Sequence, residues 1–302
     1  MKDILLSFCL PTYNSEKWIG DCLFNILKSR RMDFEIVLFY DKSSDKTLDI
    51  IKSFKDIRVR IVYNSERCSY GEMLIRCIMS GKGKYSMFVI DRNLLLMRNI
   101  ERLMTFLEKN DIGCGMCKPI NDQDYQVFDP GYDSLKNFGY RHNHIVGIFY
   151  KSEYLFKAAE HIKSIKYYNF SPEYLYAECC MMGKSLNYNM CYMNENFFSS
   201  VHNKSKSTKH KFNEWYTVFG NADYMYWSIK HLSKFELTKH EKKEIKKQIY
   251  KNTVQDSTSY YKSLLCNYTW CKHYGVDYRY VGPLELIFNR IYCSMIYMIA
   301  FL

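Results

Sequence analysis

The chain of 302 residues lacks a hydrophobic stretch long enough for an export signal or a membrane-spanning helix. Residues 1–6 contain no apolar core ahead of a cleavage site, which a secretory signal would need. At the other end, residues 284–302 are mostly apolar, but only the final 12, from Ile291 onward, carry no charge. A bilayer-spanning helix takes about 20 such residues. We therefore expect a cytoplasmic protein.

Motifs for metal, redox and nucleic-acid chemistry are also few. The chain has 12 cysteines, but Cys114 and Cys117 form the single C-x-x-C pair, so no four-thiolate zinc site is complete. Thiols stay reduced in the cytoplasm, and we interpret the cysteines as core residues. The net charge of +11 is not accompanied by a nucleic-acid-binding signature, and residues 10–13 are not a glycine-rich phosphate loop. We expect no nucleic-acid partner.

The positive charge is concentrated toward the C-terminus. Between Asn203 and Lys251 the chain has twelve Lys and five Asp or Glu. Two interpretations stay open, a solvated helical face and a surface for anionic membrane lipid with the apolar tail in the interface. We predict that residues 208–302 form a mainly helical basic subdomain, separate from residues 1–207.

The first half of the chain alternates strand-like and helix-like segments. Apolar runs typical of buried parallel strands lie at residues 4–10, 34–39, 59–63, 85–90 and 145–150. Helical spacing occurs at residues 18–27, 47–54, 72–80 and 172–183. The alternation predicts an α/β fold with a mostly parallel sheet. Pro11 is expected to end the first strand, Asn14 and Ser15 to cap the helix after it, and residues 121–140 to form a long loop.

Polar residues follow three of the predicted strands. Thr12 to Asn14 follow the first strand, Asp41 the second and Asp91 the fourth. Ligands of such sheets bind beyond the carboxyl ends of the strands. We therefore expect these residues to meet at one edge of the sheet.

The same residues belong to three segments in a fixed order, Ser7–Asn14 (SFCLPTYN), Glu35–Thr47 (EIVLFYDKSSDKT) and Gly83–Asn93 (GKYSMFVIDRN). Together they resemble family 2 glycosyltransferases, whose second segment ends in Asp-Asp-Gly-Ser-x-Asp-x-Thr and whose third carries a DXD-type motif. A weaker similarity continues through Tyr174–Cys179 and Phe197–Ser207. The resemblance implies a GT-A fold, a Rossmann-like, mixed and mostly parallel sheet, with residues 1–207 as the catalytic domain.

The resemblance also implies a site for a nucleotide-sugar donor. In the family, the residue matching Asp41 hydrogen-bonds the nucleotide base, and Thr12 and Tyr13 would bracket the same ring. We assign Pro11 and Glu16, from the same motif, to this site. For Asp41 the alternative is a turn residue that bonds its own backbone.

Asp91 and Arg92 fall where the donor diphosphate is expected. A divalent cation, Mn²⁺ or Mg²⁺, normally offsets the charge of this leaving group, and we predict that Asp91 and His202 bind it. The family carries a carboxylate at or just after Asp91, and this chain has Arg92. We assign Arg92 to the donor site, and the alternative that its guanidinium replaces the metal stays open.

The general base is expected in the segment Tyr174–Cys179. The family uses the Asp of a Glu-Asp pair, and the matching residue here is Cys179, whose thiol is a poor base at neutral pH. We therefore predict Glu178 as the catalytic base, with Glu173 as the alternative.

These features predict an inverting glycosyltransferase, of the hexosyl- or N-acetylhexosaminyl-transferase class. It would use a UDP-sugar and a glycan or lipid-linked acceptor, in the synthesis of a bacterial capsule, O-antigen or other surface polysaccharide. The enzyme would be cytoplasmic or peripheral on the inner face of the plasma membrane. Because of Arg92 and Cys179, the alternative is a catalytically impaired GT-A domain that acts as a partner in glycan assembly.

Overall fold

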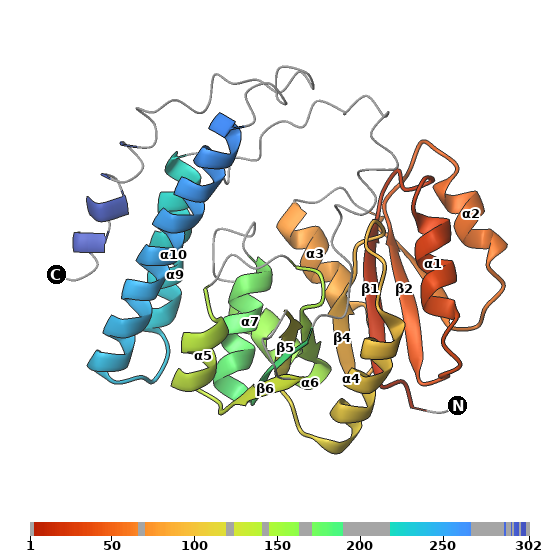
Figure 1. Cartoon of the computed structure of the whole chain (residues 1–302), viewed down its shortest axis with the longest axis horizontal. Helices are drawn as coiled ribbons and strands as arrows, with labels where there is room; N and C mark the ends of the chain where they lie inside the picture. The colour runs from red at the N-terminus through yellow and green to blue at the C-terminus, as the bar shows by residue number, and fades with distance from the viewer. Residues whose placement is uncertain are drawn as a thin grey trace. The chain divides into compact units, whose positions relative to one another are not determined.

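The computed structural model describes residues 3–65, 70–118, 124–140, 145–162, 171–189 and 218–266, together with 287, 291, 293–295 and 297–299. The chain divides into two compact units (Figure 1). The first contains Met1–Gly139 and Asn143–Val201, and the second contains Tyr140–His142 and His202–Leu302.

The first unit is built on one eight-stranded sheet with the strand order β3-β2-β1-β4-β7-β5-β8-β6. The strands are β1 (Leu6–Thr12), β2 (Phe34–Tyr40), β3 (Val59–Tyr63), β4 (Tyr85–Phe88), β5 (Cys114–Cys117), β6 (Tyr125–Phe128), β7 (Phe149–Lys151) and β8 (Ser185–Tyr188). The β1 strand is parallel to β2 and β4, and β5 is parallel to β8. The exceptions are β7, antiparallel to β4 and β5, and β6, antiparallel to β8. The sheet is therefore mixed and mostly parallel, which confirms the predicted α/β class.

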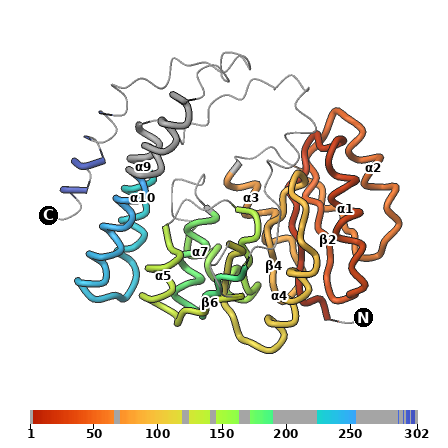
Figure 2. The backbone as a smooth tube through the Cα atoms, viewed as in Figure 1, coloured from red at the N-terminus to blue at the C-terminus, as the bar shows by residue number. Residues whose placement is uncertain are grey.

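Helices cover both faces of this sheet. They are α1 (Ile19–Leu27), α2 (Thr47–Ser53), α3 (Tyr70–Met79), α4 (Met97–Lys109), α5 (Tyr132–Phe138), α6 (Ser152–Ile162) and α7 (Ser171–Met182). On one face, apolar residues of α1, α2 and α4 share a core with alternate β1 residues such as Phe8. Cys9 points to the other face, where its Sγ lies 3.8 Å from the Ile78 carbonyl oxygen in α3. The helices α6 and α7 pack with α3 in that second layer, and Figure 2 traces the backbone through both layers.

The expected break at Pro11 is wrong, because β1 continues through Thr12. The Cys9 carbonyl accepts a hydrogen bond from Val89 on the β4 side. Pro11, two residues later, faces the same side, but the pairing with β4 ends at Cys9 and Phe88. Because Pro11 has no backbone N–H, it cannot donate to β4, but β4 offers no paired residue at this position, so no hydrogen bond between the strands is lost.

Several other expectations need correction. Residues 121–140 are not one long loop, because β6 and α5 lie within them. Gly131 precedes α5 with φ of 88°, a left-handed conformation that suits glycine. A glycine at this position is typical of a loop, which is why the sequence predicted one here. Asn14 and Ser15 do not cap α1 with their side chains, because this helix begins at Ile19.

The eight cysteines whose side chains the structure describes form no disulfide bond, and all of them are buried. Cys114 and Cys117 both lie in β5, as expected for core residues, and the Sγ of Cys114 is 3.8 Å from that of Cys180 in α7. Within the described ranges, no group of three His, Cys, Asp or Glu residues could hold a metal ion.

The second unit contains the helices α9 (Val218–Ser233) and α10 (Lys239–Cys266), which pack against each other. Ile245 and Ile249 of α10 are buried, and the Tyr140 hydroxyl lies 2.8 Å from Nδ1 of His231. A search of the described residues finds no helix that is long and apolar enough to cross a membrane.

Candidate functional site

The carboxyl ends of β1, β2 and β4 lie side by side, because the three strands are parallel neighbours. The Asp41 amide donates to the Thr12 carbonyl at 2.9 Å, which ties the ends of β1 and β2 together. On the other side of β1, Asp91 follows the end of β4 and hydrogen-bonds with the Ser15 side chain. The structure thus brings Thr12, Asp41 and Asp91 to one edge of the sheet, as expected.

Two loops at this edge are held together, starting with Asn14. Its backbone is left-handed, with φ of 47°, a conformation that Asn tolerates better than most residues. The Asn14 amide donates to Ser43 Oγ at 3.1 Å, and Asn14 Oδ1 accepts from the Ser44 amide at 2.9 Å. These reciprocal bonds fix the β1–α1 loop against the β2–α2 loop.

Glu16 and Asp45 extend this connection. Asp45 Oδ2 accepts from the Glu16 amide and Glu16 Oε2 accepts from the Lys46 amide, each at 3.1 Å. The Ser15 amide donates to Thr47 Oγ1 at 2.7 Å. Glu16 was predicted to belong to the donor site, and in the structure its hydrogen bonds join the β1–α1 loop to the β2–α2 loop. Sequence reasoning missed the pairing of the two loops, although the Asn, Ser, Asp and Thr side chains that form it are typical of turns.

The edge presents Tyr13 and Asp41 to solvent in different ways. The Tyr13 side chain is 61% exposed, so its ring is free to stack on a flat ligand. Asp41 is half-buried, and its Oδ1 accepts from the Lys42 amide at 3.0 Å, which is a turn-type bond. Thr12 is buried, and its hydroxyl donates to the Leu10 carbonyl at 3.0 Å. Pro11 lies within β1. Tyr13 and Asp41 therefore offer accessible side-chain groups, and Pro11 is half-buried like Asp41.

Asp91 and Arg92 differ sharply in environment. Burial raises the pKa of the Asp91 carboxyl, while the hydrogen bond with Ser15 and the positive charge of Arg92 act in the opposite direction. Arg92 itself is exposed. The Asp91 carboxylate offers the oxygen ligand that Mg²⁺ and Mn²⁺ prefer. His202, the second predicted ligand, lies outside the described residues, so the described part of the chain alone does not make a metal site.

The expected base lies on α7, away from solvent. Glu178 is buried, and its Oε2 lies 2.9 Å from Nδ1 of His161 in α6, a contact that sequence reasoning missed. Cys179 is fully buried, and burial raises the pKa of its thiol well above the ordinary value. It therefore stays protonated at neutral pH. Glu173, in the first turn of α7, is half-buried.

The direction of α7 separates the two glutamates. The helix ends at Met182, just before β8 begins at Ser185 at the amino edge of the sheet. Its first turn, with Glu173, therefore points toward the carboxyl edge, where Asp41 and Asp91 lie.

Comparisons with known proteins identify relatives of this chain. A 27% identical segment occurs in the uncharacterized glycosyltransferase EpsJ of Bacillus subtilis, covering 39% of this chain and 36% of that protein. The glycosyltransferase WfgD of Escherichia coli, named as a UDP-Glc:α-D-GlcNAc-diphosphoundecaprenol β-1,3-glucosyltransferase, is 24% identical over 37% of this chain and 44% of its own. The match thus spans less than half the length of these relatives.

Among solved structures, Staphylococcus aureus TarS 1-349 in complex with UDP-GlcNAc superposes with a TM-score of 0.64. It is 14% identical and covers 98% of this chain and 90% of that chain. The mannosyltransferase PcManGT of Pyrobaculum calidifontis, in complex with GDP-Man and Mn²⁺, gives a TM-score of 0.56 at 13% identity, covering 99% and 88%. These likenesses show the GT-A fold.

The glycosyl transferase family 2 model matches residues 7–163, a little over half of the chain. This segment includes β1, β2 and β4 and the edge that carries Tyr13, Asp41 and Asp91. The chain therefore belongs to glycosyl transferase family 2.

Proposed function

We propose that the chain is an inverting glycosyltransferase that moves a sugar from a nucleotide-sugar donor, with UDP-sugar favoured, to a glycan or lipid-linked glycan acceptor. The observation that carries this proposal is the carboxyl edge of the sheet, where exposed Tyr13 and half-buried Asp41 flank the end of β1 and Asp91 follows β4. The loops around them are fixed before any ligand binds, which lowers the entropic cost of binding.

Each residue at the edge has a distinct role in the proposal. Tyr13 stacks on the nucleotide base, and the Asp41 carboxylate accepts hydrogen bonds from it. Asp91 and Arg92 lie beside the diphosphate. The acceptor hydroxyl loses its proton to a carboxylate while its oxygen bonds to the anomeric carbon, and the bond from that carbon to the diphosphate oxygen breaks. The nucleoside diphosphate leaves, and no protein nucleophile takes part.

Between the two glutamates of α7, the geometry favours Glu173 as the general base. It lies in the turn of α7 nearest the carboxyl edge, whereas Glu178 is buried and already in contact with His161. A general base must come within hydrogen-bond reach of the hydroxyl proton that it removes. Glu178 then acts through the α6–α7 contact, by holding the two helices together.

A divalent cation, Mn²⁺ or Mg²⁺, completes the proposal. It would supply positive charge beside the departing diphosphate. Asp91 is the described residue that fits as a ligand, and the remaining ligands would come from the diphosphate and from His202.

For the acceptor, the support comes from the names of relatives. The Escherichia coli relative acts on a diphosphoundecaprenol-linked sugar, and a Bacillus spizizenii relative, 30% identical over 38% of this chain, is a poly(ribitol-phosphate) β-glucosyltransferase. These relatives support the further proposal that the reaction belongs to the assembly of a cell-surface polysaccharide. We propose that it takes place at the inner face of the membrane and transfers a hexosyl or N-acetylhexosaminyl group.

One observation favours a second candidate, a catalytically impaired domain that serves as a partner in glycan assembly. The residue at the family's base position is the buried thiol Cys179, whose raised pKa prevents it from acting as a base at neutral pH. In this case the edge would still bind nucleotide but would not promote transfer.

Thermal stabilisation by a panel of nucleotide sugars, followed by donor hydrolysis, tests both candidates. An active transferase is stabilised by one UDP-sugar above the others and slowly hydrolyses it. Stabilisation without turnover supports the impaired domain, and no stabilisation by any nucleotide contradicts both.

A further inference from the structure

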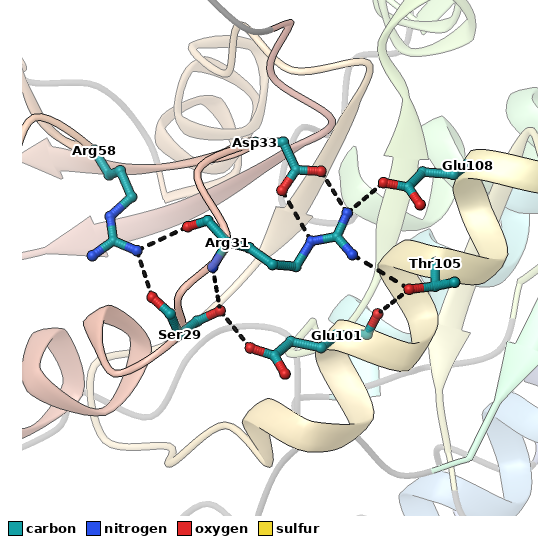
Figure 3. A network of polar contacts seen from close by, with 7 residues as sticks. All are labelled: Ser29, Arg31, Asp33, Arg58, Glu101, Thr105 and Glu108. Atoms are coloured by element: carbon teal, nitrogen blue, oxygen red, sulfur yellow. Dashed lines mark hydrogen bonds and ion pairs between the residues drawn. The ribbon is translucent and has the colours of Figure 1, made fainter.

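The connection between α1 and β2 is held rigidly against α4 by a polar network (Figure 3). Arg58 donates to the carbonyl oxygens of Ser29 at 2.7 Å and Arg31 at 3.0 Å. Ser29 Oγ donates to the Glu101 carboxylate at 2.5 Å. Two elements distant in sequence thus form one surface, on the sheet face that α1 and α4 cover.

The acidic side chains of this surface already have hydrogen-bonding partners. Arg31 forms a two-bond pair with Asp33 and also contacts Glu108, while Glu101 accepts from Ser29. Arg30, Arg31, Arg98 and Arg102 together carry four positive charges against the three carboxylates of Asp33, Glu101 and Glu108, so the surface keeps an excess of positive charge.

Three arginines are left over: Arg30, Arg98 and Arg102 are exposed, and none of them pairs with an acidic group in the described part of the chain. Arg98 and Arg102 are four residues apart in α4, on the side opposite its buried residues such as Ile100 and Leu103. Guanidinium groups that share a surface repel one another, and an anion relieves this repulsion.

The three arginines line one open concavity of about 610 Å³, together with Arg31, Glu101 and Thr105. A broad, open shape does not enclose a small molecule as a binding pocket does. It suits an extended charged surface instead.

Two apolar side chains on α1 and on the connection after it are exposed. Phe24 on the outer side of α1 is 60% exposed, and Lys28 Nζ lies 4.5 Å from the centre of its ring. Met32, two residues after Arg30, is 54% exposed. Basic residues together with exposed apolar side chains occur on surfaces that meet lipid headgroups.

We propose that the α1–β2 connection and the outer side of α4 form a docking surface for an anionic phospholipid bilayer. Arg30, Arg98 and Arg102 contact the headgroup phosphates, while Phe24 and Met32 enter the interface. The connection leads into the amino end of β2, where the Leu5 amide donates to the Asp33 carbonyl at 2.7 Å. Docking there does not cover the carboxyl edge, with Asp41 and Asp91, where the nucleotide-sugar donor is proposed to bind.

Co-sedimentation of the full-length chain with vesicles tests the proposal without donor or acceptor, so its outcome is independent of the proposed reaction. The vesicles contain phosphatidylcholine with or without phosphatidylglycerol. We expect binding to the anionic vesicles that weakens with salt, and a loss of roughly tenfold or more in the variant Arg98→Gln/Arg102→Gln, since each basic residue at such a surface contributes appreciably.

A matched variant, Lys136→Gln/Lys157→Gln, removes two exposed positive charges from α5 and α6, in the other helical layer. It should bind as the unmodified chain does, and thermal unfolding of both variants checks that they fold. Three results overturn the proposal: no binding to anionic vesicles, equal loss in both variants, or stabilisation by inorganic phosphate that depends on Arg98 and Arg102 without vesicle binding.

Discussion

Among the described residues, the Asp41 carboxylate accepts one hydrogen bond, through Oδ1 from the amide of its neighbour Lys42. The second carboxylate oxygen can therefore serve a ligand. In the proposed donor complex, Asp41→Ala removes hydrogen bonds from a charged acceptor and should weaken UDP binding by roughly 1.5–3 kcal/mol. Calorimetric titration measures the change, and Asp49→Ala, at an exposed position on α2, is the control. Equal affinities would show that Asp41 is a turn residue alone.

Arg92 and a metal ion offer positive charge to the same diphosphate, and chelation separates their contributions. We expect EDTA to abolish transfer, Mn²⁺ or Mg²⁺ to restore it, and Arg92→Ala to have a mild effect, because the cation supplies the charge. Rates with and without EDTA measure both effects. Full activity in EDTA together with a loss of order 3–4 kcal/mol in Arg92→Ala would assign the role to the guanidinium.

One substitution at each position distinguishes the roles of Glu173 and Glu178. Glu173→Gln should lower kcat by about 10²–10⁴-fold, the usual contribution of a general base, and leave UDP affinity unchanged. Glu178→Gln keeps an acceptor for His161 and should retain most activity. Steady-state rates decide the matter, and the opposite ranking would return the role to Glu178.

At the scale of elements, Glu35 joins three strands near the amino edge of the sheet. This buried carboxylate in β2 accepts from Ser7 Oγ of β1 at 2.7 Å, from Arg60 Nε of β3 at 3.0 Å and from the Lys82 amide at 2.6 Å. Burial on its own would raise the pKa of Glu35, but the hydrogen bonds from Arg60, Lys82 and Ser7 outweigh it, so the pKa is lowered.

A lowered carboxyl pKa makes the fold sensitive to acid. The stabilisation is present above the ordinary pKa of a glutamate and is lost as the pH falls through the lower folded-state value. At pH 7, Glu35→Gln should reduce the free energy of unfolding by about 2–3 kcal/mol, and the difference should shrink below about pH 4. Denaturant unfolding across pH measures this. Glu153→Gln, which breaks an exposed pair with Lys157, should have little effect.

The regular elements show what the sequence could reveal about the fold. Val59–Tyr63 was predicted with its observed bounds, and the strands β1, β2 and β4 were predicted to within two residues at each end, because each is a short apolar run between turn residues. The antiparallel β6 and the seven-residue α5 were missed, since a short, half-exposed strand and a helix after Gly131 read as loop. Local patterns carry no information about which strand pairs with which.

The candidate site divides in a similar way. Asp41 and Asp91 could be placed at one edge, because parallel strands bring their carboxyl ends together. The contact between Glu178 and His161 could not, since it depends on how α6 packs against α7. The hydrogen bond from the Thr12 hydroxyl to the Leu10 carbonyl could not be predicted either, because it depends on the strand conformation at Thr12.

For the whole molecule, the sheet extends beyond the segment that the family shares. Residues 7–163 match the family, but β8 (Ser185–Tyr188) lies between β5 and β6 and supplies a partner to both. A chain cut after residue 163 should therefore unfold without a cooperative transition, whereas one cut after Val201, the end of the first unit, should keep it. Thermal unfolding of the two truncated chains checks this. Equal cooperativity would mean that β8 is dispensable.

The strand order also determines when the protein can fold during its synthesis. The ribosome completes β6 well before it reaches β8, the strand with which β6 pairs, and α5, β7, α6 and α7 are made in between. Throughout that interval β6 has no hydrogen-bonding partner in the sheet, and its Tyr125 and Val127 side chains remain partly exposed even in the finished fold. An unpaired apolar strand of this kind can pair with another chain. Between the synthesis of β6 and that of β8 the nascent protein thus carries an unpaired strand, which a chaperone would protect.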